Sequence, residues 1–339
     1  MNAHIAGVAW VTPLGADRDT VWARLKNGDQ PELRTATNPE TGKLHRSIPV
    51  PAKFVEAVAR HPRLRRSSAI SYFGVAAGCA AFEAAGVEVT PEIAARTAVV
   101  FAITDGGVLY TRRFYEQIVK QGANSASPLL FPETVYNAPA SHFAAHLGID
   151  GASYTIVGDG AVGLNALHFG AQLLATSDID YCVVVGAEEC DWILCEAYDE
   201  WRFARTPLAE GAAAILLSRS GAHRVQTDPG ATFFRQRDAG AALETVLTRL
   251  PLDANVTLAV CSANGSFIDR AEETALKRFL PGVQRLRPKE SFGEAPGASA
   301  LLQTVAAVLA IEMGEHAKAL VMAVGMNHHA NAALIERVS

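Results

Sequence analysis

The sequence has no disulfide framework and no long apolar segment. Its five cysteines, Cys79, Cys182, Cys190, Cys195 and Cys261, form no CxxC pair and lie in mostly apolar surroundings. This usage predicts reduced core thiols in a cytoplasmic protein. No run approaches the roughly 18 apolar residues of a membrane span. No basic segment followed by a long apolar stretch opens the chain, so we expect neither a span nor a signal peptide.

Positive charge is also scarce, with 30 Lys and Arg against 35 Asp and Glu and a formal net charge of −5. Binding to nucleic acid requires clustered positive charge, so nucleic acid is not expected as the main partner. The one exception is the basic segment 60–66, Arg-His-Pro-Arg-Leu-Arg-Arg. Two interpretations remain open for it: a solvated helix start, or a docking patch for an acidic carrier protein.

Short apolar runs alternate with long Ala-rich stretches along the 339 residues. This alternation is typical of buried strands and helices in an α/β protein. A polar loop is expected at about 29–52, and the pattern starts again near residue 225. We therefore predict stacked α/β layers in two similar halves, 1–225 and 226–339. The expected strands are 5–11, 96–103, 152–157, 181–186, 212–217, 256–261 and 319–324, and the expected helices are 67–85, 111–121, 136–147, 164–174, 269–279 and 297–313.

A Gly-rich turn between a strand and a helix is the most informative segment. Gly158, Gly160 and Gly163 fit the GxGxxG spacing of a dinucleotide-binding turn. However, the next expected strand, 181–186, carries no acidic residue to bind a ribose. The turn does direct backbone N–H groups and the positive end of a helix dipole toward one point.

Segment 154–167, Tyr-Thr-Ile-Val-Gly-Asp-Gly-Ala-Val-Gly-Leu-Asn-Ala-Leu, resembles the nucleophile elbow of the β-ketoacyl-acyl-carrier-protein synthases of the thiolase superfamily. In that family a strand leads to Thr-Ala-Cys-x-Ser-Gly-Leu-x-Ala. Segments 12–15, 185–188, 209–213, 269–272 and 331–334 are similar to other family motifs in the same order. The resemblance implies a thiolase-like five-layered α/β/α/β/α fold with two pseudo-duplicated halves.

The resemblance also implies where the catalytic groups would stand. The family's acylated cysteine falls on Gly160, its first histidine on Asn264 and its second on Glu294, whereas its lysine is kept as Lys289. In the family the cysteine is activated by the helix dipole, and the two histidines support decarboxylation of malonyl thioester. None of the cysteine and histidine groups is intact here. We expect no cofactor and no metal.

Two other groups are candidates for a functional site. Cys261 ends a strand three residues before Asn264. It is therefore either a small buried hydrophobic residue or a thiol near the pocket that holds the catalytic groups in the family. His142 and His146 share a helix face at i, i+4, which is metal-like spacing, but no third ligand accompanies them. Packing at an interface is the interpretation we favour for these histidines.

The function that the resemblance implies is a non-catalytic subunit of the chain-length-factor kind. It would form a heterodimer with an active ketosynthase in fatty acid, polyketide or polyene biosynthesis, with acyl carrier protein as a further partner. Members of the family dimerise through the strand before the elbow, here 152–157. The alternatives are a homodimeric acyl-binding scaffold, or an acyltransferase with a non-standard site such as Cys261.

Overall fold

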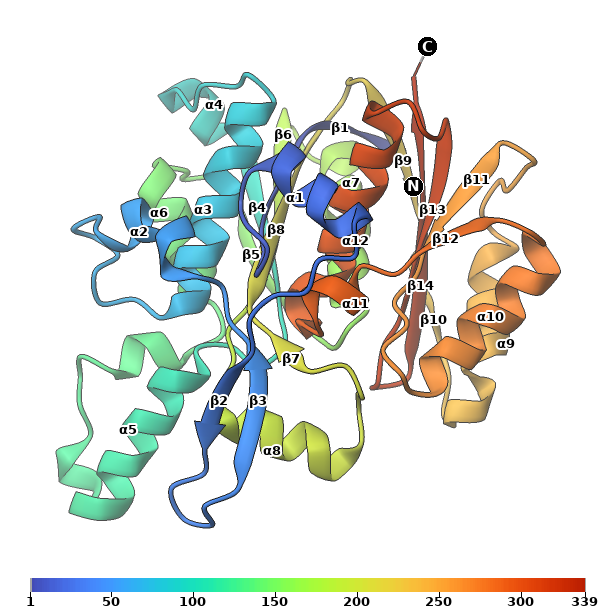
Figure 1. Cartoon of the computed structure of the whole chain (residues 1–339). Coiled ribbons are helices and arrows are strands. Elements are labelled where there is room, and N and C mark those ends of the chain that lie inside the picture. The colour runs from blue at the N-terminus through green and yellow to red at the C-terminus, as the bar shows by residue number, and fades with distance from the viewer. Residues whose placement is uncertain (1, 339) are drawn as a thin grey trace.

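The computed structural model describes residues 2–338 and has five layers (Figure 1). Ten strands form one hydrogen-bonded path, β12-β11-β13-β14-β9-β1-β8-β6-β4-β5. The path bends at the β1–β9 pairing so that its two halves face each other across α7 and α12. Helices cover the outer face of each half. The predicted α/β/α/β/α arrangement is therefore confirmed.

The two halves of the sheet repeat one pattern of strand directions. From β1, the successive pairs are antiparallel to β8, antiparallel to β6, and then parallel to β4 and β5. From β9, they are antiparallel to β14, antiparallel to β13, and then parallel to β11 and β12. The predicted division between residues 225 and 226 lies inside β9 and stays a prediction. The strands are β1 Asn2–Val11, β2 Arg34–Thr37, β3 Leu44–Ile48, β4 Thr97–Ile103, β5 Ser153–Val157, β6 Tyr181–Glu188, β7 Leu208–Ala209, β8 Gly211–Ser218, β9 His223–Thr227, β10 Ala231–Thr232, β11 Val256–Val260, β12 Gln284–Leu286, β13 Lys318–Val324 and β14 His329–Arg337.

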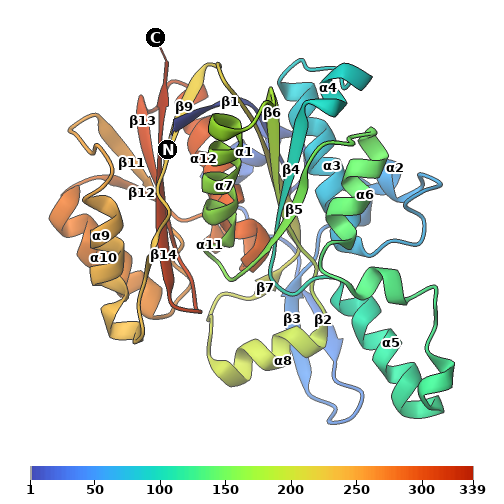
Figure 2. The same cartoon turned by 180° about the vertical axis from the view of Figure 1, so that it is seen from behind.

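The helices of the middle layer are almost entirely apolar because protein surrounds them. Every residue of α12 from Pro296 to Ile311 is buried, as expected for a helix enclosed on all sides. Gly163 lets α7 approach α12 closely, because a Cβ there would lie 3.0 Å from that of Ala300. Seen from behind, α7, β5 and α6 lie toward the viewer (Figure 2). The helices are α1 Arg18–Lys26, α2 Glu56–Ala59, α3 Ala69–Ala84, α4 Pro91–Ala95, α5 Val108–Gln121, α6 Ala138–Leu147, α7 Val162–Thr176, α8 Trp192–Trp201, α9 Ala239–Leu247, α10 Phe267–Phe279, α11 Lys289–Phe292 and α12 Pro296–Glu312.

The structure contains several elements that the sequence does not predict, among them a hairpin and the helix beside it. The loop expected at about 29–52 contains the antiparallel pair β2–β3, which joins β7 in a separate small sheet. β2 has no buried residue, and two of the three buried residues of β3 are the polar His45 and Ser47, so neither short strand has the buried apolar run that marks the other strands. Helix α8 was not predicted, and it lies beneath β7 beside this hairpin (Figure 1). No helix within residues 2–338 is long and apolar enough to cross a membrane.

Two adjacent carboxylates at the end of β6 bind the N-terminal turns of three helices. Glu189 accepts hydrogen bonds from the backbone N–H groups of Ile70 in α3 and Leu109 in α5, at 3.1 and 3.0 Å. Glu188 accepts one from Gly297 in α12 at 3.0 Å. N–H groups in the first turn of a helix have no partner within the helix, so these side chains satisfy groups that burial would otherwise leave unpaired. One strand end thus fixes the outer and the middle helical layers.

Replacing Glu189 by Gln should change how stability depends on pH. Burial raises the pKa of Glu189 to about 7 from 4.5, against the lowering effect of its backbone donors. Between these two values the unfolded chain loses a proton that the folded chain keeps, so stability falls as pH rises. The unfolding free energy of Glu189→Gln relative to wild type should therefore improve by about 3 kcal/mol from pH 4.5 to above pH 7. Urea unfolding across this range measures it. The exposed Glu88→Gln is the control, and identical pH profiles for all three proteins would contradict the prediction.

Candidate functional site

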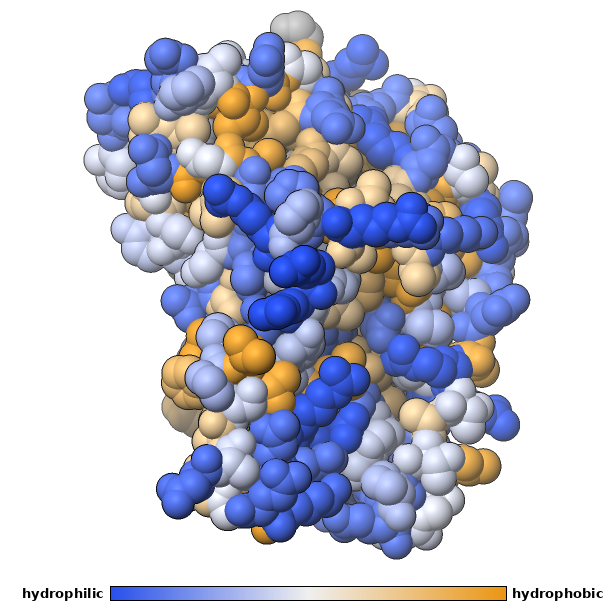
Figure 3. Space-filling model, turned by 90° about the vertical axis from the view of Figure 1, so that its left-hand side faces the viewer, coloured by the Kyte–Doolittle hydropathy of each residue, from blue (hydrophilic) through white to orange (hydrophobic). Residues whose placement is uncertain are grey.

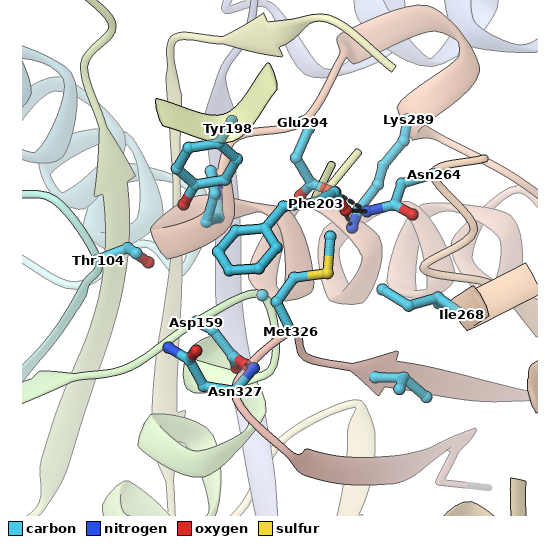
Figure 4. Close-up of a pocket in the computed structure, with 13 residues that line it drawn as sticks. Thr104, Asp159, Tyr198, Phe203, Asn264, Ile268, Lys289, Glu294, Met326 and Asn327 are labelled. Atoms are coloured by element: carbon cyan, nitrogen blue, oxygen red, sulfur yellow. Dashed lines mark hydrogen bonds and ion pairs between the residues drawn. The ribbon is translucent and has the colours of Figure 1, made fainter. Parts of the chain in front are cut away.

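A small cavity lies where strands of both halves end. It is bounded by the segments that follow β4, β5, β11, β12 and β13, a position where ligand sites of α/β sheets commonly form. Its volume is about 30 Å³, room for about two water molecules. The lining residues are Thr104, Asp159, Gly160, Tyr198, Phe203, Asn264, Ile268, Lys289, Glu294, Pro296, Val324, Met326 and Asn327 (Figure 4).

Gly160 stands in the turn between β5 and α7, which begins at Val162. A Cβ at this position would meet only the carbonyl oxygen of Val324, at 4.0 Å, so a side chain there would fit into the cavity. The neighbouring Asp159 carboxylate accepts hydrogen bonds from the backbone N–H groups of Ala161, at 3.1 Å, and of Asn327. This carboxylate ties the elbow to the turn after β13.

The loop that carries Asn264 is held by two carboxylates of α10. Asp269 accepts from the backbone N–H of Asn264 at 2.9 Å. Glu272 accepts from the backbone N–H and the hydroxyl of Ser262, at 2.7 and 2.6 Å. Burial raises the pKa of Glu272 to about 7, although the Ser262 donors and the charge of Lys289 act in the opposite direction. The Asp-x-x-Glu spacing thus positions Asn264 at the cavity.

Lys289 and Glu294 form a buried ion pair. The Lys289 Nζ lies 2.7 Å from a Glu294 carboxylate oxygen, and the two side chains are 3% and 4% exposed. The bend between them is at Gly293, whose φ of 83° favours glycine. After this bend, the backbone N–H of Glu294 donates to the Pro207 carbonyl, and the Glu294 carbonyl accepts from the backbone N–H of Ala209.

The side chain of Glu294 is fully engaged inside the protein. The Asn264 side-chain amide donates to Oε2 of Glu294 at 2.9 Å, and the Ser299 hydroxyl donates to Oε1 at 3.1 Å. Figure 4 shows Asn264, Lys289 and Glu294 converging on one side of the cavity. The donors that could otherwise bind an external oxyanion are therefore bound to a carboxylate of the chain itself.

Gly160, Asn264, Lys289 and Glu294, the four positions derived from the resemblance, all line this cavity. Cys261 does not: it packs with the outer layer of α9 and α10, and its Sγ lies 3.8 Å from the Ala259 carbonyl oxygen. Burial raises the pKa of the Cys261 thiol well above its usual value, so it is not activated as a thiolate.

The aromatic wall of the cavity was not found from the sequence. Tyr198, from α8, and Phe203, just after it, stack edge to face with ring centroids 5.6 Å apart and line the cavity (Figure 4). Met326 and Asn327 complete it from the turn after β13. No motif marks α8. The only signal in the sequence is the group of aromatic residues that follows the carboxylates at the end of β6.

Residues 3–222 match the family model of the β-ketoacyl synthase N-terminal domain. The match covers more than half of the chain, and the chain belongs to the β-ketoacyl synthase family. The 3-oxoacyl-[acyl-carrier-protein] synthase 2 of Vibrio cholerae is 26% identical over 220 residues, which cover 64% of this chain and 50% of that relative. The chain thus matches about half the length of this relative. The synthase of the same name from Coxiella burnetii is 23% identical over 91% of this chain and 85% of its own.

Solved structures confirm the thiolase-like fold. The ishigamide ketosynthase/chain length factor has a TM-score of 0.83 at 21% identity, covering 100% of this chain and 99% of its own. A ketosynthase in complex with its chain length factor from Xenorhabdus doucetiae has a TM-score of 0.80 at 15% identity, covering 99% and 98%. At these identities the likeness concerns the fold.

Removing one partner of the buried ion pair should destabilise the protein strongly. We expect Lys289→Met to lower the unfolding free energy by about 3–5 kcal/mol, because it leaves the Glu294 carboxylate buried without its counter-charge. The matched control is Lys277→Met, which breaks the exposed pair of Lys277 with Glu273 and should cost less than about 1 kcal/mol. Urea unfolding at neutral pH measures both. Equal losses in the two variants would contradict the burial of the pair.

Proposed function

We propose that this chain is a non-catalytic β-ketoacyl synthase homologue of the chain-length-factor kind. It would pair with an active ketosynthase in fatty acid, polyketide or polyene biosynthesis. The observation that carries the proposal is the set of residues lining the cavity, which includes no cysteine and no histidine. Two of its donors, Asn264 and Lys289, are bound to the Glu294 carboxylate.

The chemistry of the family explains why this content matters. Condensation needs a thiolate that takes the acyl group and donors that stabilise an enolate. Glycine at 160 supplies no nucleophile. The Lys289 and Asn264 donors already bind the Glu294 carboxylate, so they are not free to stabilise the negative charge of an enolate.

The two alternative functions have less support. A cavity of about 30 Å³ does not accommodate an acyl chain, which disfavours acyl binding beside Gly160. An acyltransferase that uses Cys261 is disfavoured because this thiol is buried away from the cavity and its pKa is raised.

An exposed apolar face supports a protein partner. The free edge strand β5 exposes Tyr154 and Val157, at 42% and 51%. Hydrophobic side chains also come to the surface at the level of α5 in Figure 3. The exposed hydrophobic residues of β5, of α5 and of the segment between α5 and α6 are together called the apolar face: Tyr115, Val119, Leu129, Phe131, Val135, Tyr136, Tyr154 and Val157. Apolar patches of this kind mark protein interfaces.

A wide hollow next to β5 supports a role in shaping a shared tunnel. It has a volume of about 740 Å³ and is lined by Thr104, Asp105, Val157, Gly158, Tyr198, Trp201, Phe203 and Asn327. Trp201 and Phe203 pack at 5.3 Å between ring centroids and form an aromatic wall. A partner seated on the apolar face would cover this hollow and turn it into an enclosed space.

The basic segment gives a place for a carrier protein. Arg60, Arg63, Arg65 and Arg66 are exposed around the buried Leu64. Arg60 pairs with Glu56, and Arg63 donates to the carbonyl of Ala145. We propose this segment as the docking patch for an acidic acyl carrier protein, through attraction between opposite charges.

The isolated chain should neither condense acyl groups nor react with cerulenin-like reagents at the elbow. Gly160→Cys should fit sterically and restore a thiol at the start of α7, yet give little condensation, since Asn264 and Glu294 remain. Incubation with acyl-carrier protein and malonyl-carrier protein, followed by mass spectrometry of the chain and of the products, measures acylation and condensation, and mass spectrometry after treatment with the reagent measures labelling. Condensation by the unmodified chain alone would end this proposal, and acylation at Cys261 would favour the acyltransferase.

We expect co-expression with a ketosynthase that is encoded by a neighbouring gene and keeps its catalytic cysteine and histidines to give a one-to-one complex. The only acylated cysteine of this complex should lie on the partner. Such obligate interfaces commonly bury more than about 2,000 Å². Trp201→Ala should then shift the products to longer chains without abolishing condensation, because it enlarges the hollow. Phe234→Ala, which removes a 90% exposed ring outside the hollow, is the control. A chain that is stable and soluble alone and binds no such ketosynthase would contradict this proposal, and a homodimer in that case would favour the acyl-binding scaffold.

A further inference from the structure

Two cysteines outside the cavity lie against each other. Cys190 follows β6, Cys195 lies in α8, and their sulfur atoms are 3.6 Å apart. Both thiols are free and pack in a small cluster with Leu208. A disulfide requires about 2.05 Å between sulfurs, so an approach of about 1.5 Å would join them.

Cys195 is 6% exposed, but it borders a cavity that Cys190 does not reach. It lines a cavity of about 220 Å³ between the β2–β3 hairpin, α8 and the segment 204–208. Leu44 and Asp199, which also line this cavity, are exposed, so the cavity opens to the surface. Cys190 is 3% exposed and lies behind Cys195. Both thiols are thus buried, and of the two only Cys195 borders this cavity.

The surroundings distinguish Cys195 from the other thiols. The hydrogen bond from Cys190 lowers the pKa of Cys195, and the charge of Arg34 acts in the same direction. Burial raises the pKa of Cys79 to about 11 and that of Cys182 to about 12. Since the thiolate is the reactive form, Cys195 is the thiol best suited to react first with an oxidant.

We propose that Cys190 and Cys195 are a redox-active pair that closes to an intramolecular disulfide when a hydroperoxide is the oxidant. The Cys195 thiolate attacks the terminal peroxide oxygen. The O–O bond breaks, a sulfenic acid forms on Cys195, and the departing alkoxide takes a proton to leave as an alcohol. The Cys190 sulfur then attacks the Cys195 sulfur. The S–O bond breaks, and the hydroxyl group leaves as water with the proton of Cys190. Two thiols lose two electrons, and the peroxide gains them.

The disulfide would act on the wall of the candidate site. Tyr198 lies one helical turn after Cys195, and it borders the cavity beside Cys195, the cavity beside Gly160 and the wide hollow. Pulling the start of α8 toward Cys190 therefore changes the position of a shared wall. This inference is independent of the proposed function, because it concerns a thiol pair outside the cavity.

Peptide mapping tests the pair in the full chain. The protein is treated with hydrogen peroxide, its free thiols are blocked with N-ethylmaleimide, and it is digested with chymotrypsin without reductant. Cleavage after Trp192 separates the two cysteines in sequence. The Cys190 peptide also contains Cys182, so we expect a linked pair of peptides in which fragmentation places N-ethylmaleimide on Cys182 and the link on Cys190. This pair is lighter by two hydrogen atoms than the two peptides with Cys190 and Cys195 reduced, and dithiothreitol separates it. Blocked thiols at both Cys190 and Cys195, or a link to any other cysteine, would overturn the proposal.

Variants define the order of the two steps. Cys190→Ala should stop at sulfenic acid on Cys195, which dimedone traps, whereas Cys79→Ala should form the disulfide as wild type does. Dimedone trapping at Cys190 in Cys195→Ala, and not at Cys195 in Cys190→Ala, would contradict the order. Trp192 and Trp201 begin and end α8, so tryptophan fluorescence should change reversibly on oxidation of wild type and stay constant in Cys190→Ala. Should a variant fail to fold, the wild-type peptide map alone decides.

Discussion

The end of β6 carries the constraint on which the rest of the structure depends. Glu188 and Glu189 are almost fully buried, and each accepts hydrogen bonds from backbone N–H groups that no helix can satisfy for itself. Through them one strand end holds α3 and α5 on the outside and α12 in the middle. Burial raises the pKa of both carboxyl groups, so this arrangement stores an electrostatic cost at the centre of the fold. Helix dipoles and N–H donors offset part of that cost. The layers, and therefore the strand ends that meet at the cavity, are positioned from this point.

The charges that line the cavity compensate each other within the protein. In place of groups that would act on a substrate, it contains a carboxylate whose oxygens already accept from Lys289, Asn264 and Ser299. A buried ion pair is stable only when such additional hydrogen bonds complete it. The same contacts that make Glu294 tolerable inside the protein remove the donors from use by any ligand. Loss of space accompanies loss of donors, since the aromatic rings of Tyr198 and Phe203 also line the cavity.

Helix α8 connects the features that distinguish this chain. It carries Cys195 near its start, Tyr198 in its middle and Trp201 at its end. These residues border the outer cavity, the candidate site and the wide hollow beside β5 respectively. The helix packs against the β2–β3 hairpin and not in the large apolar layers, so its position depends on fewer contacts than those of α7 or α12. A change in its first turn can thus reach the surface beside the free edge strand.

The sequence by itself determined the layers and the family. Buried runs such as that of β4 and the apolar α12 can only be strands and helices enclosed by protein, and the ordered motifs place Gly160, Asn264, Lys289 and Glu294 at one elbow and its neighbours. It did not determine the β2–β3 hairpin or α8, because short exposed strands and a helix with aromatic and acidic residues on several faces carry no clear periodicity. Nor could it determine that Glu294 is neutralised within a cavity of about 30 Å³, or that Cys190 and Cys195 touch. Those facts depend on side chains from segments far apart in the chain, and only the packing of the layers brings such side chains within hydrogen-bonding distance.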